Sequence, residues 1–328
     1  MKDAGLDNNN DWNKERCGTI VSTGVGGLGS IETEHTKGEI KGFDRVSPYF
    51  VPGGISNIAA ARIAIEYGLT GMCSCVVTAC AGGTNAVGDS FRMIRDGYTD
   101  VMVCGGSESC ITEFGIGGFT ALKALSETED PMRASIPFDK ERNGFVMGEG
   151  AGILVLEELE HAKARGASIY GEIAGYGVNC DAYHVTAPSP DGSGAARCME
   201  LAMADAGITP EKIAYINAHG TSTPLNDSSE TMAVKRAFGE HACRLMMSST
   251  KSMTGHLLGA SGAIEAIITT LAVKEGYVPP TINYQVPDEN CDLDIVANEG
   301  RSADITYAMS NSLGFGGHNA SLVIQKYR

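Results

Sequence analysis

Residues 73–84 read Cys73-Ser-Cys-Val-Val-Thr-Ala-Cys80-Ala-Gly-Gly-Thr84, and they join a short apolar run to a helical pattern. The run Cys73–Val77 has strand character, whereas the segment Gly83–Arg95 has the residue spacing of a helix. A strand that feeds a helix through small residues is the basic unit of an α/β protein. The stretch therefore predicts an α/β fold with Cys80 at the junction of a strand and a helix.

The same alternation of short apolar runs and longer helical patterns extends along the whole chain. Strands are expected at 19–22, 101–104, 153–156, 214–217 and 322–324. Helices are expected around 57–67, 83–95, 195–206, 227–238 and 262–274. This order is typical of buried, largely parallel strands that are covered by helices.

The chain also repeats itself weakly, which predicts two similar halves. Asp3-Ala-Gly-Leu6 and Asp205-Ala-Gly-Ile208 each lead into a strand that ends in glycine. We therefore expect two copies of one α/β unit, at 1–165 and 166–328, packed in layers. The second copy has an additional strand and helix at about 168–204. The first copy is expected to lack them, as in a chain whose N-terminal segment is missing.

Composition and charge exclude several classes of protein. The chain has 328 residues, of which 43% are apolar and 20% charged, and its formal net charge is −15. Such a balance argues against nucleic acids and anionic membrane surfaces as partners. No apolar run is long enough to cross a bilayer, and the polar N-terminus shows no secretory signal. The ten cysteines form no zinc-binding pairs, so reduced thiols in the cytoplasm are expected.

Three residues in glycine-rich or hydroxyl-rich turns are candidates for covalent chemistry. A sulfur at the N-terminus of a helix is favoured as thiolate, which makes Cys80 a candidate nucleophile. His219 lies in Asn-Ala-His-Gly-Thr-Ser-Thr, and His256 is expected to open a helix of small residues. The alternative is that Cys80 is a buried structural cysteine and that each histidine has a structural role. A purely structural role is harder to assign to two histidines in such turns than to one.

The last such segment runs from Ser310 to Asn319 and contains Phe315 between glycines. A loop of this composition can move, and it can offer a backbone N–H group to a developing oxyanion. Taken alone, the segment is better explained as a glycine-rich turn between two strands.

Five segments in this order resemble those of the β-ketoacyl-acyl-carrier-protein synthase family, in its elongating branch of bacterial fatty acid synthesis. They are 78–83 (Thr-Ala-Cys-Ala-Gly-Gly), 139–145 (Asp-Lys-Glu-Arg-Asn-Gly-Phe), 217–224 (Asn-Ala-His-Gly-Thr-Ser-Thr-Pro), 248–256 (Ser-Ser-Thr-Lys-Ser-Met-Thr-Gly-His) and 314–319 (Gly-Phe-Gly-Gly-His-Asn). The resemblance implies the thiolase fold, with two α/β halves in five layers (α-β-α-β-α), and a homodimer.

The resemblance also implies an acyltransferase reaction, the decarboxylative condensation of malonyl-carrier with an enzyme-bound acyl chain. Cys80 would hold the acyl chain, and the N–H groups of Cys80 and Phe315 would form the oxyanion hole. His219 and His256 would bind the malonyl thioester and stabilise the enolate. Lys251 would support the site electrostatically.

Further residues receive roles from the resemblance alone. Glu265 would pair with Lys251, Phe315 would act as a gate together with the loop 181–193, and Thr221 and Thr223 would bind the phosphopantetheine arm. The remaining substrate-binding positions are Val25, Phe119, Asp181, Gly316 and Asn319. Val25 would lie where the acyl tunnel meets the dimer interface, and its small size predicts tolerance of longer acyl chains.

No cofactor is expected to be required, because the phosphopantetheine arm arrives on the acyl carrier protein. Carrier docking would use Arg45, Lys123 and Arg62. Some members of the family hold a structural monovalent cation, Na⁺ or K⁺. The matching positions here are Asn217, Glu230, Glu265, Ser310 and Asn311.

Two alternatives stay open at this point. A thiolase would have a second cysteine in the C-terminal loop, and an initiating synthase would have asparagine in place of His256, so neither fits. A ketosynthase of a polyketide pathway differs only by degree. A non-catalytic homologue is the second alternative, because a chain without its first strand and helix could be inactive despite a complete set of catalytic residues.

Overall fold

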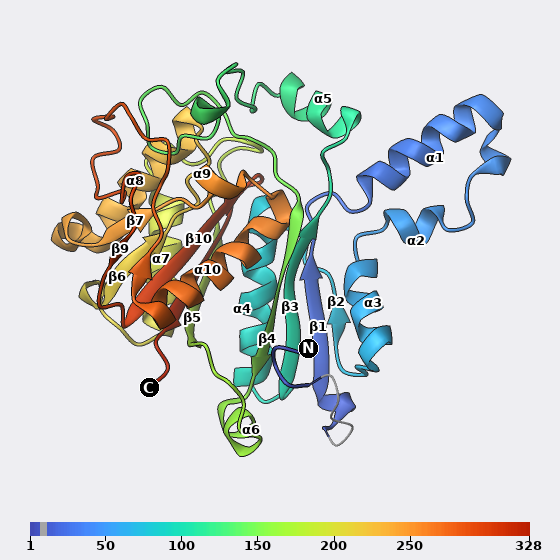
Figure 1. Cartoon of the computed structure of the whole chain (residues 1–328), viewed down its shortest axis with the longest axis horizontal. Helices are drawn as coiled ribbons and strands as arrows, with labels where there is room; N and C mark the ends of the chain where they lie inside the picture. Colours follow the sequence, from blue (N-terminus) through green and yellow to red (C-terminus); the bar gives the residue numbers. More distant parts are fainter. Residues whose placement is uncertain (7–11) are drawn as a thin grey trace.

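The computed structural model describes residues 1–6 and 12–328, and it contains two large mixed sheets (Figure 1). The first sheet has the strand order β2-β1-β3-β4 and the second has β5-β11-β10-β6-β7. The strands of the first sheet are β1 (Cys17–Ser22), β2 (Cys73–Ser74), β3 (Val101–Glu108) and β4 (Gly150–Glu157). Those of the second are β5 (Glu172–Cys180), β6 (Ile213–Asn217), β7 (Met246–Ser248), β10 (Tyr307–Gly314) and β11 (His318–Gln325). A small antiparallel pair joins β8 (Tyr277–Val278) to β9 (Arg301–Ser302).

The helices form three layers around these sheets. The helices are α1 (Leu28–Lys41), α2 (Phe50–Gly54), α3 (Ile58–Tyr67), α4 (Gly82–Arg95), α5 (Glu113–Ala121), α6 (Leu159–Ala164), α7 (Ser193–Asp205), α8 (Pro224–Phe238), α9 (Lys251–Thr254) and α10 (Ser261–Glu275). The pair α4 and α10 lies between the two sheets, α3 covers the outer face of the first, and α7 and α8 cover the outer face of the second (Figure 1). The expected α-β-α-β-α order is therefore present.

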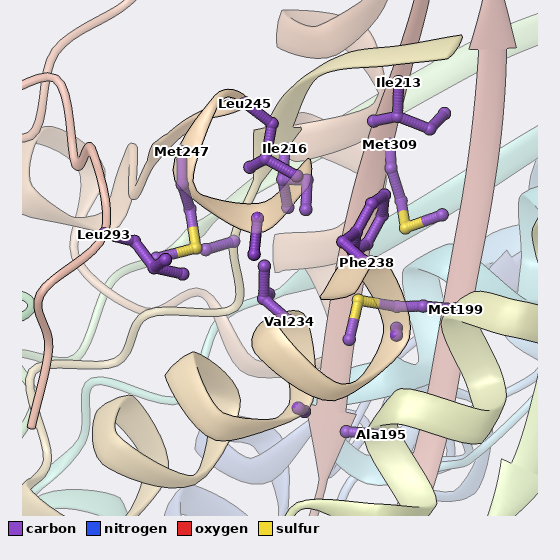
Figure 2. Close-up of a cluster of buried hydrophobic side chains, with 14 of the residues drawn as sticks. Ala195, Met199, Ile213, Ile216, Val234, Phe238, Leu245, Met247, Leu293 and Met309 are labelled. Carbon is purple, nitrogen blue, oxygen red and sulfur yellow. The ribbon is translucent and has the colours of Figure 1, made fainter. Parts of the chain in front are cut away.

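Close packing of α4 against the start of α10 forms the middle of the molecule. A Cβ atom on Gly83 would lie 2.6 Å from the backbone nitrogen of Ala263, so only glycine permits this approach. The largest apolar cluster lies on the other side of the second sheet, where Met199, Phe238 and Met309 pack together (Figure 2). These residues come from α7, α8 and β10, and their burial fixes the outer helix layer on the sheet.

The two sheets differ at one edge. Among the described residues, β4 pairs only with β3, whereas its counterpart β11 pairs with both β10 and β5. As a result β11 is buried along its length, while β4 is largely half-buried or exposed and borders a groove of about 740 Å³. In the described part of the chain, the second sheet thus contains a strand, β5, next to β11, and no strand takes the corresponding place next to β4.

Several sequence-based boundaries need correction. The strand expected at Cys73–Val77 is only β2, because the chain turns away from β1 after Ser74 to reach the Cys80 junction. In each large sheet one strand, β4 or β11, runs antiparallel to its neighbours. The helices α1, α2 and α5 were not predicted. In the described residues no helix is both long and apolar enough to span a membrane.

Candidate active site

Cys80 lies in a short 3-10 helix, Ala79–Ala81, which passes directly into α4. Ala79 has a φ of 48°, a left-handed conformation that is unusual for a residue with a side chain and is often found at functional sites. A Cβ atom on Gly314 would lie 2.8 Å from the carbonyl oxygen of Thr78 and 3.3 Å from the nitrogen of Cys80. The end of β10 is thus pressed against the cysteine turn, and the two halves of the chain meet at the sulfur.

Burial, and not the helix terminus, dominates the acidity of the thiol. Burial raises the pKa of Cys80 to about 11, although Lys251 and the backbone N–H groups of Phe315 and Cys80 itself lower it. The helix terminus was expected to favour the thiolate, and here the backbone N–H groups do lower the pKa of Cys80, but burial has the larger and opposite effect. The same two N–H groups lie close to the sulfur, which is the placement needed to stabilise an oxyanion on an attacked carbonyl group.

His219 and His256 lie next to each other, with ring centroids 5.3 Å apart and planes at 87°. His219 follows β6, and its backbone N–H donates to Glu230 Oε1 over 2.8 Å. His256 was expected to open a helix, but it lies between α9 and α10, where its N–H donates to the carbonyl of Val146. Both rings are buried, and burial together with the charge of Lys251 holds both pKa values well below the usual range.

The hydrogen bonds of the two rings define which nitrogen faces the site. Lys251 Nζ lies 3.4 Å from His219 Nδ1, and an ammonium group can only donate, so Nδ1 is the acceptor. Ser261 Oγ accepts from the N–H of Leu257, lies 2.9 Å from His256 Nδ1 and can donate its hydroxyl hydrogen to that nitrogen. Neutral imidazoles with an acceptor at Nδ1 carry their proton on Nε2. Both histidines therefore offer an Nε2–H donor.

Lys251 and Glu265 form a buried ion pair behind His219. Lys251 is 1% exposed and Glu265 is 2% exposed, and Lys251 Nζ donates to Glu265 Oε1. Burial raises the pKa of Glu265, and the charge of Lys251 opposes that rise. The pair places a fixed positive charge close to His219 and to the Cys80 thiol.

A cavity of about 400 Å³ joins the nucleophile and the two histidines. Among the residues singled out in the sequence, its walls include Cys80, Phe119, Lys123, Asp181, His219, Thr221, Thr223, His256, Phe315 and Asn319. The Oγ atoms of Thr221 and Thr223 lie 2.9 Å apart, so the two hydroxyls form one polar patch on the wall. Val25 and Gly316 do not line this cavity, and Lys251 and Glu265 lie behind it.

The glycine-rich segment is the tight turn between β10 and β11, as its composition alone favoured. Three hydrogen bonds tie the turn and the start of β11 to the loop 181–193, and in one of them the N–H of Asp181 donates to the carbonyl of Gly317 over 2.8 Å. Asn319 Nδ2 donates to Asp181 Oδ1 over 2.6 Å, and the N–H of Gly316 donates to the carbonyl of Val185 over 2.7 Å. A movement of Phe315 would thus have to involve this loop, and the gating role remains a prediction.

The five positions matched to a cation site are all buried, but they are not equally free to bind one. Glu265 Oε2 and Ser310 Oγ have no hydrogen-bond partner among the described residues. Glu230 uses both oxygens on the N–H groups of His219 and Gly220, and burial raises the pKa of Glu230 to about 7. Asn217 lies 3.5 Å from Thr250 Oγ1, and Asn311 Oδ1 accepts from Ser321. Two unpartnered oxygens suit a cation, and its presence stays a prediction.

The three basic residues expected to dock a carrier are exposed and do not lie together. Lys123 is at the mouth of the cavity, with a φ of 54°. Arg45 lies beyond the end of α1, where it pairs with Asp44, and Arg62 lies on α3. Only Lys123 is therefore placed next to the cavity.

Sequence reasoning missed buried polar residues that hold the site together. Arg142 is 7% exposed, donates to Asp288 and lies 3.6 Å from Asp227 at the start of α8. Asp227 in turn accepts from the N–H of Phe138, which has a φ of 66°. The charge of Arg142 within the 139–145 segment was the available signal, but its partners Asp227 and Asp288 are far away in the sequence.

Comparisons with known proteins agree with this fold. Family models match residues 1–162 as the N-terminal domain, and residues 170–285 as the C-terminal domain, of β-ketoacyl synthases. The curated protein 3-oxoacyl-acyl-carrier-protein synthase 2 of Synechocystis sp. is 53% identical over 320 residues, which cover 97% of this chain and 77% of that protein. The protein with the same name from Staphylococcus aureus is 54% identical over 327 residues, or 100% of this chain and 79% of that protein. The chain belongs to the β-ketoacyl synthase family.

Solved structures define the fold in the same way. A β-ketoacyl synthase from Burkholderia phymatum superposes with a TM-score of 0.93 at 38% identity, covering 100% of this chain and 79% of that one. A structure described as a type II polyketide acyl-carrier protein in complex with its ketosynthase bound to the hexaketide gives a TM-score of 0.96 at 41% identity, with coverages of 100% and 82%. The fold is therefore the thiolase fold of ketosynthases, as the motifs implied.

Proposed function

We propose that the protein is an elongating condensing enzyme, which joins a malonyl unit to an acyl chain held on Cys80 and releases carbon dioxide. The observation that carries the proposal is one cavity containing a buried thiol, two backbone N–H donors and two Nε2–H donors. Relatives that are 53–54% identical over nearly the whole chain are named 3-oxoacyl-acyl-carrier-protein synthase 2, which supports fatty acid elongation as the pathway. The acyl and malonyl groups would then arrive on an acyl carrier protein.

The first half-reaction loads the enzyme. The Cys80 sulfur attacks the carbonyl carbon of an acyl thioester, a new carbon–sulfur bond forms, and the carrier thiol leaves with the proton that Cys80 gives up. Because the Cys80 pKa is raised to about 11, the sulfur has to give up its proton as the bond forms, and the departing carrier thiolate takes that proton. The N–H groups of Cys80 and Phe315 stabilise the tetrahedral oxyanion.

The second half-reaction forms the new carbon–carbon bond. The Nε2–H groups of His219 and His256 donate to the thioester carbonyl of the malonyl group. As the bond to the carboxylate breaks, carbon dioxide leaves and the electron pair becomes an enolate that these donors stabilise. The enolate carbon attacks the acyl carbonyl, the bond to Cys80 breaks, and one proton from solvent restores the thiol. The net products are 3-oxoacyl-carrier and carbon dioxide.

A homodimer is part of this proposal. The segment from α1 to α3, called the excursion here, lies at the outer strand β2 of the first sheet. Helices α1 and α2 extend beyond this strand, and α3 packs on β1 and β2 (Figure 1). The excursion carries a group of exposed apolar side chains, which are Ile40, Phe43, Tyr49, Val51, Ile55 and Ile65. Met72 and Val77 on either side of β2 are also exposed. A second copy of the chain would bury this surface, and Val25, which is 40% exposed, would then lie near the interface.

No cofactor is proposed for the chemistry, because covalent catalysis and hydrogen-bond donors supply every step. A monovalent cation is proposed only as a structural ligand, held by oxygens such as Glu265 Oε2 and Ser310 Oγ. Lys123 is the residue best placed to meet an acidic carrier at the cavity mouth, since the chain as a whole carries a net charge of −15. The location is proposed to be the cytoplasm.

A polyketide ketosynthase is the second candidate, because the likeness to a polyketide ketosynthase complex has a TM-score of 0.96. The higher identity to the fatty acid synthases favours the first candidate. Product size separates the two, since an enzyme that extends one substrate repeatedly without reduction would release poly-oxo products.

The purified chain should convert acyl-carrier and malonyl-carrier into 3-oxoacyl-carrier and carbon dioxide in equal amounts. The measurement is mass spectrometry of the carrier together with the release of labelled carbon dioxide, beside a Cys80→Ala control. We expect the control to form no 3-oxoacyl product, because no thioester can form at position 80. A folded wild-type chain that yields no product, or a Cys80→Ala chain that still does, would contradict the proposal.

A further inference from the structure

Glu108, the last residue of β3, is a buried carboxylate to which the mechanism above gives no role. It is 4% exposed, and its two oxygens receive four donors from other parts of the chain. Oε1 accepts from Thr23 Oγ1 over 2.8 Å and from the N–H of Val25 over 3.4 Å. Oε2 accepts from the N–H of Gly24 over 2.6 Å and from the N–H of Gly259 over 2.9 Å.

These donors belong to two segments that reach the site from opposite halves of the molecule. Val25 precedes α1 in the first half, and Gly259 follows His256 by three residues in the second. The backbones touch, because a Cβ atom on Gly259 would lie 2.3 Å from the nitrogen of Gly24. Leu258, between His256 and Gly259, has a φ of 47°, so the turn is held in a conformation that it would not adopt freely.

The carboxylate is balanced by N–H and O–H dipoles and not by a cation. Among the described residues no lysine, arginine or histidine forms a salt bridge with Glu108. Hydrogen bonds from several backbone N–H groups are the usual way to hold a buried carboxylate without a counter-ion. Losing either of the two donor segments, 23–25 or the turn that contains Gly259, would leave this carboxylate with too few donors. The carboxylate therefore fixes both segments to β3.

Glu108 is also one of the charges that act on the Cys80 thiol. Its negative charge raises the pKa of Cys80, against the opposite effect of Lys251 on α9. The other titratable groups that line the same cavity are His219, His256, Lys123 and Asp181, and Cys110 also interacts with the sulfur. Both histidines are neutral in this environment, because burial lowers their pKa values. Glu108 is thus the negative charge that opposes Lys251 at the nucleophile.

We propose that Glu108 is a positioning residue, which fixes the His256 turn and the Thr23–Val25 segment relative to each other across the two halves. Its negative charge also lowers the reactivity of Cys80. The inference rests on the proposed function and adds to it a residue that touches no substrate. A carboxylate at this place has two separable effects. Its oxygens place the His256 donor for decarboxylation, while its charge acts on the thiol.

The test compares two reactions in Glu108→Gln. The side-chain amide keeps the size of the carboxylate, but in either orientation its NH₂ group faces a backbone N–H donor, that of Val25 in one and those of Gly24 and Gly259 in the other. Displacing the His256 turn should slow the release of carbon dioxide from malonyl-carrier by roughly 10²-fold. Losing the negative charge should speed the alkylation of Cys80 by iodoacetamide at pH 8 and move its pH profile to lower pH. A general loss of structure would also expose the buried Cys80 thiol and speed its alkylation, so the two reactions are compared only in variants whose thermal unfolding matches that of the wild type.

The controls separate charge from position. Glu108→Asp keeps the charge and shortens the reach, so it should retain the wild-type alkylation profile while decarboxylation falls. Glu149→Gln removes an exposed carboxylate that accepts from Ser109 and Ile111, and it should change neither reaction. Thermal unfolding shows which variants are folded.

Unchanged decarboxylation in folded Glu108→Gln, or a parallel fall in both reactions, would overturn the proposal. A wild-type chain without decarboxylation would contradict the proposed function instead. In that case the alkylation rates of the wild type and the two Glu108 variants still decide whether the charge acts on Cys80. If Glu108→Gln does not fold, Glu108→Asp decides the positioning role, because its decarboxylation must fall while its alkylation profile stays that of the wild type.

Discussion

Replacing His256 with alanine should lower the release of carbon dioxide from malonyl-carrier by about 10²- to 10³-fold, the usual loss when one donor to a developing oxyanion is removed. His219→Ala should have an effect of the same size. Both rings offer an Nε2–H group to the cavity, since their Nδ1 atoms accept from Ser261 and Lys251. Loading of the acyl chain onto Cys80 uses the N–H groups of Cys80 and Phe315, and it should change far less.

The comparison requires both half-reactions to be measured on the same preparations. His161→Ala is the matched control, because His161 lies on α6 and bonds Glu157 away from the cavity. An equal loss of loading and decarboxylation would mean that the histidines maintain the structure of the site and do not act on the malonyl group. Full decarboxylation in either variant would remove that histidine from the mechanism.

Breaking the buried Lys251–Glu265 pair should have the largest effect on stability. In Glu265→Ala the ammonium group of Lys251 would remain buried without its partner, and such a change costs about 3–5 kcal/mol in the free energy of unfolding. The double variant Lys251→Met, Glu265→Leu removes both charges, and it should recover most of the lost stability. Urea unfolding followed by circular dichroism measures each value, and activity should stay low in the double variant because His219 has lost its donor, Lys251.

An exposed pair provides the reference for this measurement. Lys163 and Glu160 form an ion pair on α6 with side chains that are 43% and 74% exposed. Glu160→Ala should therefore change the free energy of unfolding by less than about 1 kcal/mol. If Glu265→Ala is no more destabilising than Glu160→Ala, the buried pair does not hold the site together.

Much of the fold could be predicted from local sequence patterns. The alternation of apolar runs and helical patterns located β1, β3, β4, β6 and β11 and the helices α3, α4, α7, α8 and α10. The weak repeat predicted two halves, and the described strands form one sheet in each. These features are local. Each apolar run is buried within its own sheet, so it can be predicted without information about distant residues.

Other elements gave no such signal. Helix α5 contains three glycines in nine residues, and α1 buries only Leu28 and Gly38, so neither shows a helical apolar face. Helix α1 extends away from the two sheets (Figure 1), and α5 contributes Phe119 to the wall of the cavity. Their place is set by tertiary contacts that the sequence pattern does not encode.

The candidate site was predicted in part. The motifs singled out Cys80, His219, His256 and Phe315, and the fold brings all four to one cavity. The helix terminus at Cys80 can be read from the sequence, but the burial of the sulfur, which has the larger effect on its pKa, cannot. Glu108 was missed for a similar reason. Its donors lie about 85 residues before it and about 150 after it, so only the folded chain shows that it holds them.

Mass spectrometry of the chain after incubation with an acyl-carrier thioester tests the central claim most directly. The account predicts one added acyl mass on the peptide that contains Cys80, and none in the Cys80→Ala chain. The other nine cysteines should stay unmodified, because none shares the cavity with the two histidines and the N–H donors. A folded wild-type chain that takes up no acyl group, or one that carries it on another cysteine, would show that Cys80 is not the nucleophile.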